Sequence, residues 1–130
     1  MWFSGDIKGY RKLSVKMWYP ADNIASLKKA PYLNKHKLIG SAISKLFGVP
    51  EALMDRAGGV KCNSWLNAAP TNGKFPIIIY SHGHQSIKIA NTSQAEEVAS
   101  NGYIVVAMDH SYDAALTILD ENKIIYSRSK

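Results

Sequence analysis

The sequence has a single cysteine, no long apolar run and no recognisable leader. Cys62 has no partner within the chain, so an internal disulfide is excluded and the residue is expected to be a small buried hydrophobe. No stretch approaches the roughly 18 apolar residues that a membrane-spanning helix requires. The first residues lack the basic start and apolar core of a secretory signal. These absences leave the compartment open between cytoplasmic and secreted.

The composition is that of an ordinary globular protein, with 46% hydrophobic and 20% charged residues. A chain of 130 residues is one domain or part of one, and it can bury a core. The net charge is +6, from sixteen Lys and Arg against ten Asp and Glu. Basic proteins attract anionic lipids or nucleic acid. Because these cations are spread out, a solvated face is the simpler interpretation. Nucleic acid is not an expected partner, and contact with a lipid surface stays open.

The first strand is predicted over residues 10–19, where apolar and polar residues alternate. Pro20 ends it, because proline cannot donate to a strand ladder. The alternation predicts one buried and one wet face. The expected buried face holds Leu13, Val15 and Met17, and the expected wet face holds Lys12, Ser14 and Lys16.

Two helices and a connecting stretch are predicted in the next part of the chain. Apolar residues recur at helical spacing over 35–47, and Gly48 is the expected stop. A second short helix is predicted over 50–56. Residues 60–74 are rich in turn-forming Asn, Pro and Gly, so they are expected to form a connection without regular structure.

A βαβ unit is predicted after this connection. The run Ile77–Ile79 and the run 103–108 are continuously apolar, which is typical of parallel strands covered on both faces. A helix is predicted over 87–100 between them, with Asn91, Thr92 or Ser93 as its N-cap, Ser93–Glu96 as a capping box, and Asn101-Gly102 as its end. The two strands should be parallel. Beyond them, 123–127 is expected to return as a hairpin onto 117–119 through a turn at 120–122.

The segment His82-Gly83-His84 follows the first of these apolar strands and is the strongest candidate for chemistry. Acyl transfer needs fixed N–H donors for the oxyanion of its tetrahedral intermediate. The backbone N–H of His84 is placed to be such a donor, and Gly83 would let an acyl oxygen approach without a Cβ in the way. His82 is expected to brace the turn by hydrogen bonding.

Other interpretations of this region are weaker. Ser81 lacks flanking glycines and is a poor nucleophile candidate. His82, His84, Asp109 and His110 should lie at one sheet edge and could hold a metal, but their spacing matches no common zinc pattern. Asp109 and His110 are expected to fix the loop after their strand, and Asp113 to cap the segment that follows it. No cofactor is expected.

Several segments resemble the plasma-type and bacterial platelet-activating-factor acetylhydrolases, which are lipase-like α/β-hydrolases. The resemblance covers about residues 10–127. It rests on Arg11–Asp22 (RKLSVKMWYPAD), Ala30–Leu33 (APYL), Phe75–His84 (FPIIIYSHGH), Glu96–His110 (EEVASNGYIVVAMDH) and Tyr112–Ala115 (YDAA).

The resemblance implies an α/β fold, the N-terminal portion of an α/β-hydrolase with antiparallel first strands, then a βαβ unit, and an incomplete sheet. The single partial domain 1–130 would divide into a first strand region (1–22), a helical and loop insertion (23–74), a βαβ unit with the oxyanion loop (75–110) and a loop with a short hairpin (111–130). The strand at 77–80 would then lie at a sheet edge, and the isolated chain should dissolve poorly.

The resemblance also implies a Ser-Asp-His carboxylic-ester hydrolase acting on short sn-2 acyl esters of phospholipids, such as 1-alkyl-2-acetylglycerophosphocholine, without a metal. The family's serine lies in a Gly-x-Ser-x-Gly elbow, which is missing from these 130 residues. Nucleophile, acid and base would then belong to the missing C-terminal half, only the His84 N–H carries over, and the chain alone should be inactive. The alternative is a non-enzymatic half-fold that binds a lipid surface or a metal.

Overall fold

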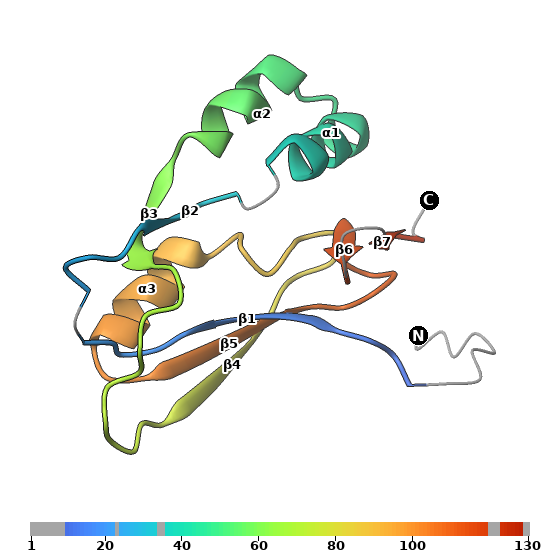
Figure 1. Ribbon diagram of the computed structural model, residues 1–130. Coiled ribbons are helices and arrows are strands. Elements are labelled where there is room, and N and C mark those ends of the chain that lie inside the picture. Colours follow the sequence, from blue (N-terminus) through green and yellow to red (C-terminus); the bar gives the residue numbers. More distant parts are fainter. Residues whose placement is uncertain (1–9, 23, 34–35, 120–122, 129–130) are drawn as a thin grey trace.

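The structure is a computed structural model that describes residues 10–22, 24–33, 36–119 and 123–128 (Figure 1). The predicted turn at 120–122 lies outside the described residues, as do residues 1–9 of the predicted first strand region. The strands are β1 (Ser14–Trp18), β2 (Lys29–Pro31), β3 (Lys61–Trp65), β4 (Ile77–Ser81), β5 (Ile104–Asp109), β6 (Leu116–Ile118) and β7 (Ile124–Tyr126). The helices are α1 (His36–Phe47), α2 (Glu51–Gly58) and α3 (Thr92–Ser100). None of these helices is long and apolar enough to cross a membrane.

The central sheet has three strands in the order β1-β5-β4. Strands β4 and β5 pair in parallel, from Ile77 opposite Ile104 to Ser81 opposite Met108, and α3 connects them. Strand β1 is antiparallel to β5, with Ser14 opposite Asp109. The predicted βαβ unit and antiparallel first strand are therefore confirmed. Strand β4 lies at the edge of this sheet, as expected, among the strands that the structure describes.

Helix α3 covers one face of the central sheet. Its small residues Ala95 and Ala99 pack on Trp18, Val105 and Ala107, all of them buried. Small side chains let the helix approach the sheet closely, and the buried indole of Trp18 packs in the same layer. The helix ends as predicted at Asn101, and Gly102 follows with φ +88°.

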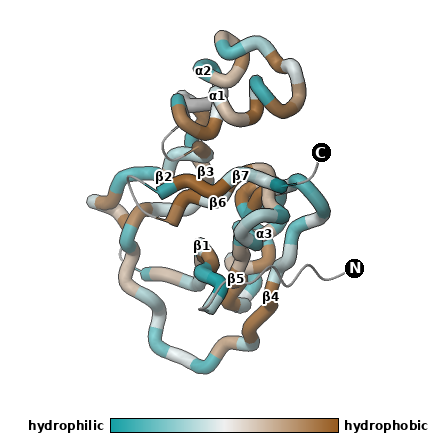
Figure 2. Tube along the Cα trace, turned by 90° about the vertical axis from the view of Figure 1, so that its right-hand side faces the viewer, coloured by the Kyte–Doolittle hydropathy of each residue, from teal (hydrophilic) through white to brown (hydrophobic). Residues whose placement is uncertain are grey.

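The opposite face of the sheet is exposed, which corrects two predictions. Val15 and Met17 are 49% and 57% exposed, while Ile77 and Ile79 are 63% and 68% exposed. Their register places all of them on the side of Val106, away from Trp18. Alternation tells which residues share a face, but it does not tell which face a helix will cover. Here α3 covers the face of β1 that holds Lys16. The opposite face, with Val15, Met17, Ile77 and Ile79, is called the isoleucine face below. In the described part of the chain nothing covers it, although β4 and β5 are strongly apolar (Figure 2).

A second apolar cluster joins the remaining elements. Helices α1 and α2 form where they were predicted, and Gly48 ends α1 with φ +67°. The hairpin of β6 and β7 also forms as predicted, with Leu116 opposite Tyr126. The cluster comprises Leu33, Ile39, Ala42, Ile89 and Leu116, so it ties α1 and the hairpin to the segment before α3.

The stretch 60–74 was predicted to be irregular, but it contains β3, which pairs antiparallel with β2. Five residues between turn formers give too short a pattern to reveal a strand.

The predicted capping box is also wrong. The carboxylate of Glu96 does not return to its own helix but accepts hydrogen bonds from Ser64 Oγ at 2.5 Å and from the Ser64 and Asn63 backbones at 2.9 and 3.1 Å. Burial alone would raise the pKa of Glu96, but these donors outweigh it and lower the pKa. Cys62 is buried, as predicted, and burial raises the pKa of its thiol.

We predict that the exposed isoleucine face causes self-association. Ile79→Thr keeps a β-branched residue on the edge strand, so it should reduce concentration-dependent association while changing the free energy of unfolding by less than about 0.5 kcal/mol. The matched change Val105→Thr, on the covered face, should cost about 1–3 kcal/mol because it buries a hydroxyl. Light scattering and urea unfolding measure the two effects. Unchanged association of the Ile79→Thr protein would contradict the assignment of this face.

Candidate active site

Two turns meet where the parallel strands end. The His-Gly turn (residues 82–86) follows β4, and the facing turn (residues 110–115) follows β5. Two backbone hydrogen bonds join them, from Gln85 N–H to Asp113 O at 3.1 Å and from Ala115 N–H to Ser86 O at 3.0 Å. Each turn holds one non-glycine residue in the left-handed region, Gln85 with φ 55° and Tyr112 with φ 76°. Such backbone persists only where the surrounding contacts hold it.

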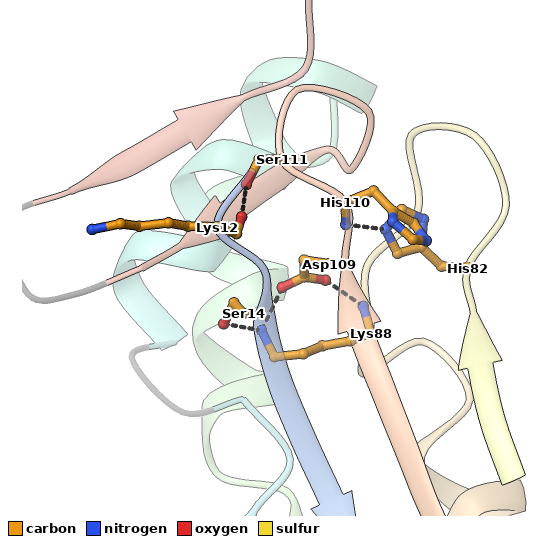
Figure 3. A network of polar contacts seen from close by, with 7 residues as sticks. All are labelled: Lys12, Ser14, His82, Lys88, Asp109, His110 and Ser111. Atoms are coloured by element: carbon orange, nitrogen blue, oxygen red, sulfur yellow. Dashed lines mark hydrogen bonds and ion pairs between the residues drawn. The ribbon is translucent and has the colours of Figure 1, made fainter. Parts of the chain in front are cut away.

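His82 braces the His-Gly turn from inside. Its side chain is buried, and its Nε2 accepts a hydrogen bond from the His110 backbone N–H at 3.2 Å. A ring nitrogen that accepts carries no proton, so the proton belongs on Nδ1. Nδ1 lies 2.7 Å from Gly83 O, to which it can donate. The imidazole therefore links the end of one strand to the first residue after the other (Figure 3).

The backbone of Gly83 and His84 is the open part of this turn. Among the residues that the structure describes, neither backbone N–H donates to a hydrogen bond. A Cβ built on Gly83 would meet nothing within 4 Å, and the φ of Gly83 is not in the left-handed region. The fold itself therefore does not require a glycine here. This glycine therefore leaves open space on its side-chain side, next to the two unpaired N–H groups of the described turn.

The His84 side chain is exposed and contacts Asp113. Its Nδ1 lies 3.1 Å from Asp113 Oδ1, and both side chains are more than half exposed. Asp113 was expected to cap the segment after it, but its carboxylate binds His84 instead. An exposed pair of this kind contributes little stability, and it joins the side chains of the two turns.

Ser81 and His110 form a pair that sequence reasoning missed. Ser81 Oγ lies 2.7 Å from His110 Nε2, because the last residue of β4 and the first residue after β5 meet across the parallel register. A serine hydroxyl bonded to an imidazole is two-thirds of a triad. No carboxylate binds the other ring nitrogen within the described residues. The pair therefore holds the strand ends together without the group that would orient a general base.

Asp109 is buried, and its carboxylate binds Lys88. Asp109 Oδ1 accepts from the Lys88 backbone N–H at 2.6 Å, and Oδ2 pairs with Lys88 Nζ. The same ammonium donates to Ser14 Oγ at 2.9 Å, so one lysine joins the segment before α3 to β5 and β1 (Figure 3). The carboxylate was expected to fix the loop after its own strand, but it holds the segment before α3 instead. Its partner was not predicted, since no local pattern pairs residues 21 positions apart.

The four residues proposed as metal ligands pair separately. Asp109 binds Lys88, His84 binds Asp113, and the rings of His82 and His110 stand 5.2 Å apart between centroids. Within the described ranges, no group of three or more His, Cys, Asp or Glu side chains is arranged to hold a metal ion. The site offers backbone N–H donors rather than a ligand set.

Comparison with known proteins places this geometry in context. Residues 4–124 match the family described as platelet-activating factor acetylhydrolase, isoform II. The chain is 27% identical over 85 residues to a platelet-activating factor acetylhydrolase of Gallus gallus, covering 65% of this chain and 18% of that protein. It is 36% identical over 59 residues to the Cavia porcellus enzyme of the same name, covering 45% of this chain and 14% of that protein. The chain thus spans less than a fifth of the length of these curated relatives.

A solved structure is similar over most of the chain. The ferulic acid esterase from Streptomyces cinnamoneus superposes with a TM-score of 0.75 and 29% sequence identity. The match covers 91% of this chain and 31% of the esterase. The mixed α/β arrangement with its incomplete sheet is therefore that of an α/β-hydrolase.

We predict that the pair of Lys88 and Asp109 is the main electrostatic support of this site. Lys88→Met leaves a carboxylate buried without its partner and should lower the free energy of unfolding by about 3–5 kcal/mol. Asp109→Asn in the same protein keeps an acceptor for the Lys88 backbone and should restore much of the loss. Lys74→Met, on an exposed lysine, is the control. If Lys88→Met costs no more than Lys74→Met in urea unfolding, the pair does not support the site.

Proposed function

The chain belongs to the platelet-activating factor acetylhydrolase, isoform II, family, and on this premise we propose that it forms the oxyanion half of the active site of a serine carboxylic-ester hydrolase. The substrate class we propose is a short-chain acyl ester of a phospholipid, met at a lipid surface. The similarity to an esterase structure supports ester chemistry more broadly.

The observation that supports this proposal best is the backbone N–H of His84, which has no acceptor among the described residues and lies beside a glycine that the fold does not require. Fixed N–H donors stabilise developing negative charge because they need no reorganisation during the reaction. The turn is held by buried His82 on one side and by the facing turn on the other. A donor on so well-anchored a turn keeps its direction when a ligand arrives.

The proposed reaction follows from this arrangement. A serine hydroxyl attacks the ester carbonyl carbon while a histidine takes its proton, and the carbonyl oxygen becomes an oxyanion that accepts from His84 N–H. When the tetrahedral intermediate collapses, the alcohol leaves with the proton from the histidine. Water then repeats the two steps on the acyl-serine and releases the carboxylic acid.

The serine is proposed to lie outside these residues. The sequence holds no Gly-x-Ser-x-Gly, and Ser81 lacks an oriented base because His110 has no carboxylate partner within the described residues. We therefore expect the 130-residue chain to show no turnover of p-nitrophenyl acetate that a serine-directed reagent can inhibit. Inhibitable turnover by this chain would contradict that part of the proposal.

The oxyanion role is tested in a chimaera in which this chain replaces the part of the Streptomyces cinnamoneus esterase that it matches. His84→Pro removes the N–H and should lower kcat/KM by about 10²–10³-fold, whereas His84→Ala keeps the N–H and should change it little. Gly83→Ala should lower kcat/KM without lowering stability, since the fold leaves room for its methyl group. Equal activity of the His84→Pro and His84→Ala proteins, both folded by circular dichroism, would contradict the role.

A further inference from the structure

A cavity of about 590 Å³ lies at the other end of the central sheet from the two turns. It is bounded by the last residues of β1, by β2 and β3, and by the second half of α3. The register places the end of β1, Trp18, opposite Val105 near the start of β5, whereas the two turns follow the ends of β4 and β5. In Figure 1 the α3 and β3 end of the molecule is accordingly remote from β6 and the site beside it. The volume is that of an ordinary small-molecule pocket.

The walls of this cavity are mainly aromatic and aliphatic. Trp18, Tyr19, Trp65 and Leu66 line it from β1, β3 and the residues after them. The lining includes one carboxylate, that of Glu96, which already accepts three hydrogen bonds from Ser64 and Asn63. Its oxygens are therefore occupied by the protein itself. Because this carboxylate is already engaged, the cavity favours a ligand that brings its own anionic group.

Two ammonium groups face the cavity, each over an indole ring. Lys29 Nζ lies 4.0 Å from the centroid of Trp65 and donates to Asn63 O at 3.1 Å. Lys16 Nζ lies 4.6 Å from the centroid of Trp18. In the part of the chain that the structure describes, Lys16 has no hydrogen-bond acceptor and no ion pair. Burial lowers the pKa of Lys16, and the nearby Cys62 and Glu96 only partly offset this.

We propose that this cavity binds an amphiphilic carboxylate, whose anionic group pairs with Lys16 and whose apolar body lies between Trp18 and Trp65. The ligand should place its anionic group at Lys16, because a half-buried ammonium without an acceptor is stabilised by an anion. The indole rings supply the apolar contact, and the ammonium groups that lie over them supply the positive charge. The site uses none of the residues of the two turns, so it is separate from the ester-hydrolysing site proposed above.

Decanoate is a suitable probe, and decanol is its uncharged counterpart. Trp18 and Trp65 line the cavity, so intrinsic tryptophan fluorescence of the 130-residue chain reports binding directly. We expect saturable binding of decanoate and weaker binding of decanol. Lys16→Met keeps the length of the side chain and should weaken decanoate about 10- to 100-fold, the loss expected for one hydrogen bond to a charged group, while leaving decanol unchanged.

Two controls make the result decisive. Lys12→Met removes an exposed charge near the same strand and should leave the affinity for decanoate unchanged. Ile79→Thr alters the exposed isoleucine face and should also leave it unchanged. Binding that does not saturate, or that falls with Ile79→Thr and not with Lys16→Met, would overturn the proposal. Should Lys16→Met prove unfolded by circular dichroism, Lys29→Met replaces it, with a smaller loss expected and an unchanged affinity as the contrary result. No ester is used, so this outcome is independent of the proposed hydrolase function.

Discussion

The parallel pairing of β4 with β5 is the constraint on which the site depends. Parallel strands end at the same edge of a sheet, so the residues after each strand must meet. The register that sets Ser81 opposite Met108 also brings Ser81 to His110 and His82 to the His110 backbone. Lys88 then joins the segment between the His-Gly turn and α3 to Asp109. Without this register, the His-Gly turn would be an exposed loop with no fixed direction.

The sequence was sufficient to predict the elements that repeat a local pattern. The continuous apolar runs of β4 and β5, the helical spacing of α1 and the glycine after α3 each mark an element that the structure contains. What could not be predicted depends on contacts between distant residues. Examples are the pairing of β3 with β2, the use of Glu96 by Ser64, and the pairing of Lys88 with Asp109. The face of β1 that α3 covers also depends on packing, and the alternation alone suggested the wrong one.

The two ends of the sheet have opposite chemical character. At the strand ends, polar groups pair with one another, and within the described ranges the backbone N–H groups of Gly83 and His84 have no acceptor. At the other end, aromatic walls and two ammonium groups surround a cavity. Trp18 and Lys16 belong to the same face of β1 as Ser14, which contacts Lys88. One strand therefore contributes to both ends, and its covered face is more polar than its exposed one.

An ordered turn presents the His84 backbone N–H, which has no acceptor in the part of the chain that the structure describes. Amide hydrogen exchange of the chain, followed residue by residue by NMR, tests it most directly. The backbone N–H groups of Gln85 and Ser86 donate to Asp113 O and Gly83 O, so these two amides should be protected from exchange. The neighbouring amide of His84 should exchange rapidly. Protection of the His84 amide equal to that of Gln85 and Ser86 would contradict the claim, because the donor would already be engaged within the fold.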